Sequence, residues 1–229
     1  MSGAGQRSAI MPTKVTGDYS KLPAEIREVF PYLYGEACEL RTSWTVYEHL
    51  FMANEVRTKL LSEVLGPFLG RFQNLLQDEM FIAIGRMTDP DTRAQKNLTF
   101  WSLVEGCEKW NPEVGGELRT RVKALAADAK GIRQHRHKRL AHYDMAVSLE
   151  VSSLPKVTLG RIRCVIEEMQ ALVNFVSTRA GFGTIIFESL DNPGLTWNAE
   201  LAVYKSRAYD ALEQAGIIPQ GEWEKSWIK

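Results

Sequence analysis

The sequence predicts an all-α protein: an up-and-down helical bundle with a small C-terminal appendage of α or α/β structure. From residue 22 onward, apolar residues recur at spacings of three and four, the period of amphipathic helices. Capping residues and prolines punctuate this pattern, and strand-like runs are short, at residues 146–151 and 183–187. We therefore expect a disordered lead-in over residues 1–20, a bundle over 21–180, and an appendage over 181–229 packed on the bundle.

Composition places the chain among ordinary globular proteins, with 229 residues of which 45% are hydrophobic and 24% charged. Its 28 basic and 28 acidic residues cancel, which excludes the strong overall positive field of a dedicated duplex-wrapping protein. Any nucleic-acid binding must therefore be local. No window reaches the roughly 18 uninterrupted apolar residues of a membrane span. Residues 1–14 lack the apolar run that a secretory signal needs, so we expect this stretch to be a disordered lead-in.

The three cysteines are far apart and lie within amphipathic patterns, so we interpret them as reduced core thiols; they are Cys38, Cys107 and Cys164. Together with the absence of a membrane segment, this indicates a cytoplasmic protein.

The first half of the bundle is predicted as three helices. The first covers residues 24–30 and ends at Pro31, because proline lacks an amide hydrogen and clashes with the preceding turn. The second covers residues 35–53. The third begins near Asn54 and runs toward Met87, with a kink or division at Pro67 after Gly66.

Turn formers and caps bound the later helices. Residues 88–92 form a loop, and Thr99 caps a helix that ends at residues 111–112. Thr158 begins another helix, which closes at Gly181. Residues 198–214 are predicted as a last helix.

One helix carries a continuous apolar stripe, at steps of four, three, four and three: Leu118, Val122, Leu125, Ala129 and Ile132. The next position of that stripe is Arg136. A guanidinium that replaces an aliphatic side chain must be paired with a carboxylate, or face a cleft or the surface of a partner protein. The alternative to a functional role is an internal ion pair with one of three carboxylates: Asp78, Glu79 or Asp89.

Residues 130–142 read KGIRQHRHKRLAH and hold five basic residues and three of the four histidines, with no acid between them. Such a cluster forms a local anion site in a neutral protein. Histidine exchanges protons near neutral pH and arginine matches a phosphate, so the segment has what metal-free cleavage of RNA requires. One histidine can hardly act as base and acid at once, which favours a second histidine or a second protomer.

The segment from Arg136 to His142 resembles the signature of HEPN domains, an arginine and a histidine separated by four to six residues. The Tyr143-Asp144 pair that follows resembles the sequence of the AbiU2-like branch of this family, and that branch is associated with abortive infection. The resemblance extends over much of residues 30–176. It includes the helix around Trp44 and Tyr47, the segment Arg86-Met87-Thr88-Asp89-Pro90, and the helix start at Asn97-Leu98-Thr99.

The resemblance implies an α-helical bundle that dimerises, with both motifs facing a shared cleft, and metal-independent endoribonuclease activity in active members. By this analogy the protein is of toxin-antitoxin or phage-defence type, with Arg136 holding the scissile phosphate and His142 as general acid or base. The expected partners are RNA, a second copy of the chain and a possible cognate antitoxin. No cofactor and no metal are expected.

The rest of the cluster is assigned to binding and orientation. The residues expected to bind substrate are Arg133, His137, Lys138 and Arg139. Tyr143 and Asp144 are expected to orient the site, with Asp144 bonded to His142 or His137, or only capping the chain. His137 stands where many members have asparagine. It can replace that residue, add a second proton carrier, or mark a member without activity.

Helix geometry constrains this assignment. Six residues of a regular helix turn about 600°, which leaves Arg136 and His142 about 120° apart. Either the helix unwinds near Ala141, or the site is composite across a two-fold axis.

Other interpretations stay open. His142 can donate a hydrogen bond to free carbonyls at the end of a helix. Alternatively, a zinc ion can be bound by His135, His137, His142 and Asp144. The segment can also serve a non-catalytic RNA-, nucleotide- or protein-binding module, or clamp a subunit interface.

Overall fold

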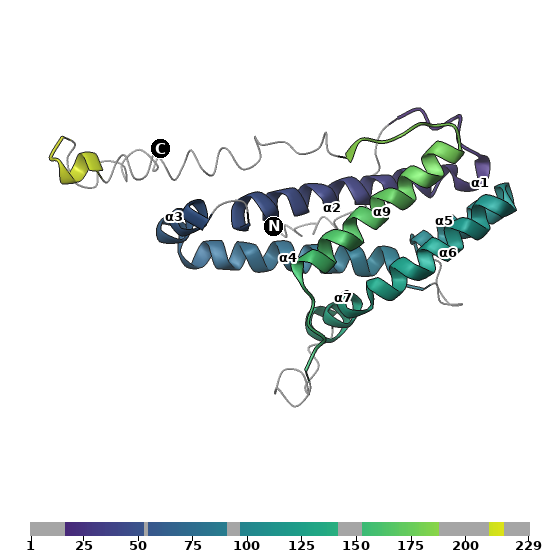
Figure 1. Ribbon diagram of the computed structural model, residues 1–229. Helices are drawn as coiled ribbons and strands as arrows, with labels where there is room; N and C mark the ends of the chain where they lie inside the picture. Colours follow the sequence, from purple (N-terminus) through teal and green to yellow (C-terminus); the bar gives the residue numbers. More distant parts are fainter. Residues whose placement is uncertain (1–16, 53–54, 91–96, 142–152, 188–210, 218–229) are drawn as a thin grey trace, which may run out of the picture. The chain divides into compact units, whose positions relative to one another are not determined.

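A computed structural model describes residues 17–52, 55–90, 97–141, 153–187 and 211–217 (Figure 1). Within these ranges the regular secondary structure is helical and there is no strand, so the predicted all-α helical bundle is confirmed. The chain divides into two compact units, residues 1–44 with 77–190 and residues 45–76 with 191–229. No helix in the described ranges is long and apolar enough to cross a membrane.

The first helices begin and end differently from the prediction. Helix α1 is only Ala24–Arg27, and α2 runs over Phe30–Phe51, so Pro31 lies in the first turn of a helix instead of ending one. Amides of a first turn have no partner within the helix, so proline's missing hydrogen costs nothing there. The predicted start of the second helix at residue 35 was therefore wrong.

The expected division at Pro67 is confirmed. Helix α3 (Glu55–Leu65) and α4 (Pro67–Thr88) are separated by Gly66, whose φ of 46° lies in the left-handed region that glycine adopts readily. Pro67 occupies the first position of α4, where its fixed φ suits a helix start. In the second unit, three leucines pack into a small core: Leu50, Leu61 and Leu69.

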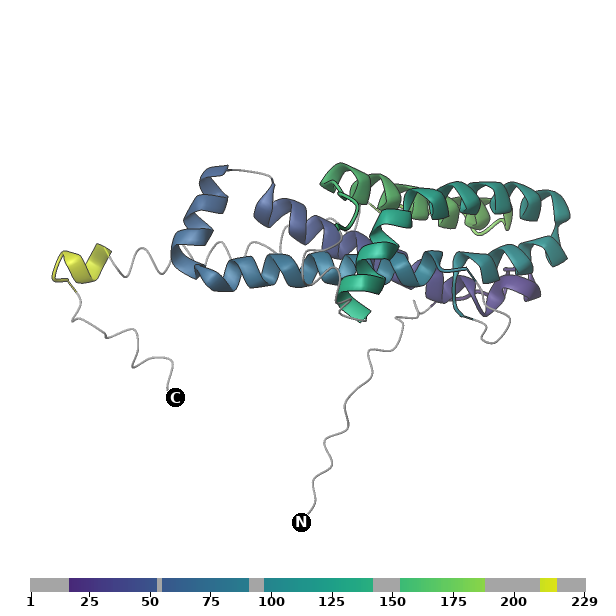
Figure 2. The same cartoon turned by 90° about the horizontal axis from the view of Figure 1, so that it is seen from below.

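In the first unit, α5 (Phe100–Trp110), α6 (Pro112–Asp128) and α9 (Leu159–Arg179) pack in chain order, α5 on α6 and α6 on α9 (Figure 2). Their starts are capped by side chains. Thr99 and Ser102 form a reciprocal capping box, Asn111 accepts from the amides of the next turn, and Thr158 accepts from Arg161. The predicted boundaries at these three caps are confirmed.

The predicted apolar stripe is buried along its whole length, from Leu118 to Ile132. The helix that carries it is not continuous, because α6 ends at Asp128 and α7 (Lys130–His135) follows. Residues Arg136–Ala141 then form a π-helix, η1. The stripe therefore brings Arg136 to the start of a wider helical turn.

The end of α9 is closed by Gly181, as expected. Its φ is 71°, and the amide of Phe182 donates to the Ser177 carbonyl at 2.9 Å, the pattern of a Schellman motif. The strand expected over residues 183–187 is absent from the described chain. Instead, the Asn174 side chain bonds both the amide and the carbonyl of Ile185, at 2.7 and 3.0 Å, in place of a neighbouring strand.

The strand expected over residues 146–151 lies outside the described residues, as does most of the predicted last helix, of which a turn at 211–214 is described. The boundaries of the lead-in and of the appendage therefore stay predictions.

A close contact between α1 and α5 gives a stability prediction. A Cβ added at Gly106 would lie 2.6 Å from the backbone oxygen of Glu25, whereas one added at Gly116 would meet nothing within 4 Å. We expect Gly106→Ala to lower the free energy of unfolding by about 1–3 kcal/mol, because backbone must move. The control Gly116→Ala should leave it unchanged or raise it by up to about 1 kcal/mol. Urea unfolding measures both, and equal effects would contradict the packing described.

The cysteines give a second prediction. Burial raises the pKa of Cys107 to about 12 and that of Cys38 to about 11, so both thiols stay protonated at neutral pH. Cys164, which we expected in the core, is exposed on α9 because it lies on the polar side of that helix. A thiol reagent at pH 8 should therefore modify Cys164 rapidly in the native protein. Cys164→Ser should abolish the rapid reaction, and a persistent fast phase would show that a buried thiol is accessible.

Candidate functional site

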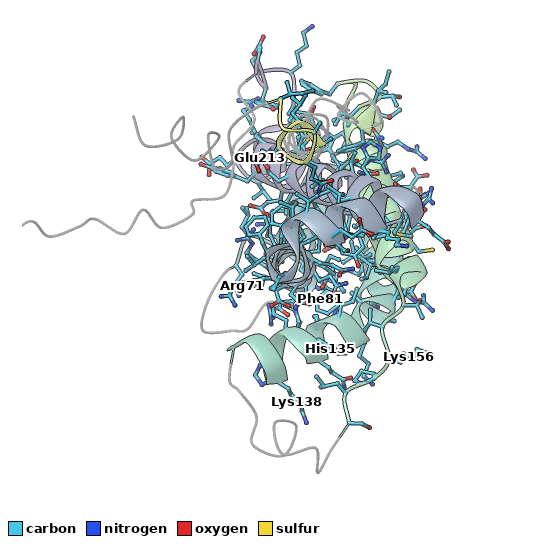
Figure 3. The ribbon with its side chains drawn as sticks, turned by 90° about the vertical axis from the view of Figure 1, so that its left-hand side faces the viewer. Arg71, Phe81, His135, Lys138, Lys156 and Glu213 are labelled. Atoms are coloured by element: carbon cyan, nitrogen blue, oxygen red, sulfur yellow. The ribbon has the colours of Figure 1, made fainter. Side chains whose placement is uncertain are left out.

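The basic segment lies on α7 and η1, against the C-terminal part of α4, and all three belong to the first unit. The ring of His135 contacts the ring of Phe81 of α4, with centroids 5.5 Å apart (Figure 3). One turn further along α4, Gly85 lies against the side chain of Arg136. The end of α4 is therefore the surface on which the motif rests.

Arg136 is held by Asp89, which follows the last residue of α4. Its Nη1 donates to Oδ2 of Asp89 at 2.5 Å, with side chains 23% and 27% exposed respectively. Of the three carboxylates that the sequence offered, Asp89 is the partner. Since the pair keeps contact with solvent, the guanidinium is paired without being enclosed.

Gly85 makes this placement possible. A Cβ at this position would lie 2.7 Å from Cδ of Arg136, closer than side chains approach, so any larger residue would push the arginine away. Gly85 was not predicted as a site residue from the sequence. The available signal was a glycine four residues before Asp89 in an otherwise helix-forming segment, a placement that suggests a close approach.

Arg133 reaches the same helix end. Its Nη1 donates to the Thr88 carbonyl at 3.4 Å, where a cation is favoured by the partial negative charge of a helix C-terminus. Burial lowers the pKa of Arg133, Asp89 raises it, and the positive charge of Arg136 lowers it further. Arg133 and Arg136 therefore both lie near Asp89 at the end of α4, and Arg136 forms the ion pair with it.

His135 has a structural position. Its Nε2 lies 2.8 Å from the carbonyl oxygen of Pro155, and its Nδ1 is buried with no hydrogen-bond partner among the described residues. It thereby joins α7 to both α4 and the segment that leads into α9, near Lys156 in Figure 3. Of the other possible zinc ligands, His137 is exposed on η1, while His142 and Asp144 lie outside the described residues.

The remaining site residues are only partly described. Lys138 is half-buried and lies on the side of η1 turned away from α4 (Figure 3). The side chain of Arg139 falls outside the description, and so do His142, Tyr143 and Asp144. The structure thus brings Arg133 and Arg136 together, and the pairing of Arg136 with His142 stays a prediction.

The π-helix changes the geometry of the motif. Residues Arg136–Ala141 depart from regular α-helix, so the 120° separation expected for a regular helix does not apply to this segment. Single π-helical turns occur frequently at functional sites, because they redirect side chains locally.

The contacts of His135 predict an unequal response to two neighbouring substitutions. His135→Ala removes a hydrogen bond and an aromatic contact, so the free energy of unfolding should fall by about 1–2 kcal/mol. Gln134 is exposed on the same helix, so Gln134→Ala should change it by less than about 0.5 kcal/mol. Thermal or urea denaturation distinguishes them. Equal values would mean that His135 does not anchor α7.

Comparison with known proteins supports the assignment that the motif suggested. The model of the HEPN_AbiU2 family, described as AbiU2, matches residues 24–198. No curated protein and no solved structure gives a match. The matched region covers most of the 229 residues and includes α1, α9 and the whole basic segment. The chain therefore belongs to the AbiU2 family of HEPN domains.

Proposed function

We propose that this protein is a metal-independent endoribonuclease of toxin-antitoxin or abortive-infection type, acting on RNA through Arg136 and His142. The observation that supports this most is the state of Arg136. Its guanidinium is anchored through Nη1 alone, while Nε and Nη2 have no partner among the described residues. An arginine fixed in this way is prepared to bind an anion at little cost in side-chain entropy.

The proposed reaction needs a base, an acid and a positive charge. The base removes the proton of the 2′-hydroxyl, and the 2′-oxygen attacks the adjacent phosphorus. The bond from phosphorus to the 5′-oxygen then breaks, and the acid protonates that oxygen. The products are a 2′,3′-cyclic phosphate and a free 5′-hydroxyl, with no water or metal consumed.

The roles follow from the side chains. Arg136 stabilises the charge that develops on the phosphorane, and His142 serves as base or acid. Because one imidazole cannot fill both roles in the same step, we propose that a second protomer completes the site in a homodimer, or that His137 acts as the second proton carrier. Arg133 adds positive charge near Arg136, and Lys138 and Arg139 bind flanking phosphates.

The decisive assay uses single-stranded RNA in EDTA. Wild type should cut it and leave a 2′,3′-cyclic phosphate, whereas His142→Ala and Arg136→Ala should lower the rate at least about 100-fold, because each removes a group used in the transition state. Lys123 is an exposed cation of α6, so Lys123→Ala is the matched control for loss of one positive charge and should retain activity.

Two results would count against the nuclease. One is intact RNA with wild type, and the other is equal cutting by wild type and His142→Ala. Salt-sensitive binding that Arg136→Ala weakens, with no product, would instead identify a non-catalytic RNA-binding module.

A further inference from the structure

We infer that Gly85 and Asp89 are positioning residues for Arg136: Gly85 lies against the side chain near Cδ, Asp89 bonds Nη1, and the Nε–Nη2 edge is left to bind two oxygens of a phosphate. This inference rests on the proposed function of the same site and extends it to the end of α4, outside the segment from Arg136 to His142. By this inference, the C-terminal end of α4 contributes positioning residues to the proposed RNA site.

Asp89 is itself well placed to fix a partner. It follows the last turn of α4, where the Thr88 hydroxyl donates to the Ile84 carbonyl at 2.7 Å and Arg133 donates to the carbonyl of Thr88. These bonds restrain the backbone immediately before Asp89. Its carboxylate meets Arg136 through one bond, from Nη1 to Oδ2 at 2.5 Å. A single bond through Nη1 fixes the direction of the guanidinium and does not use its other N–H donors.

Gly85 restrains the same arginine from another direction. The atoms closest to a Cβ at Gly85 are Cδ, Nε and Nη1 of Arg136, at 2.7, 3.0 and 3.1 Å; Nη2 is not among these three. Because Nε and Nη1 are almost equally distant, Gly85 lies over the face of the side chain near Cδ, whereas Asp89 bonds Nη1. Nη1 is the terminal nitrogen on the Cδ side of the guanidinium, so the parallel N–H groups of Nε and Nη2 form the edge opposite to it.

The Nε–Nη2 edge of Arg136 has the geometry to bind a phosphate. The Nε and Nη2 hydrogens of arginine are parallel, and they match two oxygens of a phosphate in a bidentate bond. The local charge fits as well: two guanidinium groups, Arg133 and Arg136, and one carboxylate, Asp89, sum to one positive charge. A phosphodiester carries one negative charge, so binding it neutralises the end of α4.

Binding of a fluorescent single-stranded RNA, measured by anisotropy, tests the inference. All proteins are full-length and carry His142→Ala, so that no RNA is cut. Gly85→Ala and Asp89→Ala should each weaken binding about tenfold, because the arginine loses its position. Asp89→Asn should weaken it less, since the amide oxygen still accepts from Nη1.

Matched controls come from the same chain. A Cβ at Gly70 of α4 meets nothing within 4 Å, and Asp128 forms an exposed pair with Arg161 at 2.7 Å. Gly70→Ala and Asp128→Ala should therefore leave affinity within about twofold. In an Arg136→Lys background, which keeps the positive charge but has no guanidinium, Gly85→Ala and Asp89→Ala should have no further effect on affinity. If these two residues only stabilised the fold, their effect on affinity would persist in that background.

Three results would overturn the inference: unchanged affinity in both Gly85→Ala and Asp89→Ala, equal losses in the Arg136→Lys background, or tighter binding in Asp89→Ala, which would make the carboxylate a competitor of RNA. If circular dichroism shows that Gly85→Ala is unfolded, the affinities of Asp89→Ala and Asp89→Asn for RNA test the inference instead.

Cleavage by the protein with His142 intact is measured in parallel. Binding without cleavage contradicts the nuclease alone. Cleavage with unaltered binding by both Gly85→Ala and Asp89→Ala contradicts the positioning role of these two residues alone. No RNA binding contradicts both.

Discussion

The ion pair between Arg136 and Asp89, formed across the contact of α7 and η1 with the end of α4, is the interaction on which this site depends. It places a permanent cation where the apolar stripe of α6 and α7 ends, and it keeps that cation partly open to solvent. A fully buried pair would cost desolvation and be closed to ligands, and an exposed arginine would lose side-chain entropy on binding. The observed pair is intermediate, which suits a group that must be fixed and accessible.

The rest of the first unit supports this pair through ordinary packing. The caps at Thr99, Asn111 and Thr158 determine where α5, α6 and α9 begin, and the buried stripe fixes the face that α6 presents. His135 then joins α7 to Phe81 and to the backbone at Pro155, so the residue before Arg136 is anchored on two sides. Membership of the AbiU2 family and this anchored arginine are separate observations, and the proposed RNA site rests on both.

The helical class, the helix boundaries at Thr99, Asn111 and Thr158, and the unusual position of Arg136 could all be predicted from the sequence, because each depends on local spacing and side-chain chemistry. Pro31 was misinterpreted because a proline that ends one helix and a proline that begins the next have the same local signature. The prediction of a strand over residues 183–187 was wrong because the backbone of Ile185 bonds the side chain of Asn174 instead of a neighbouring strand. The approach of Gly85 to Arg136 is a contact between distant segments, so the glycine itself was its only local signal. The π-helix was not predicted from the sequence. The position of His142 lies beyond the part of the chain that the structure describes.

The proposed binding of a phosphate by Arg136 is tested most directly by an experimental structure of the protein with a short RNA in which a 2′-O-methyl group blocks cleavage. We expect one phosphate within hydrogen-bond distance of both Nε and Nη2 of Arg136, Asp89 still bonded to Nη1, and His142 of one protomer near the modified 2′-oxygen or the 5′-oxygen. RNA bound elsewhere, with Arg136 enclosed between Asp89 and protein, would contradict it.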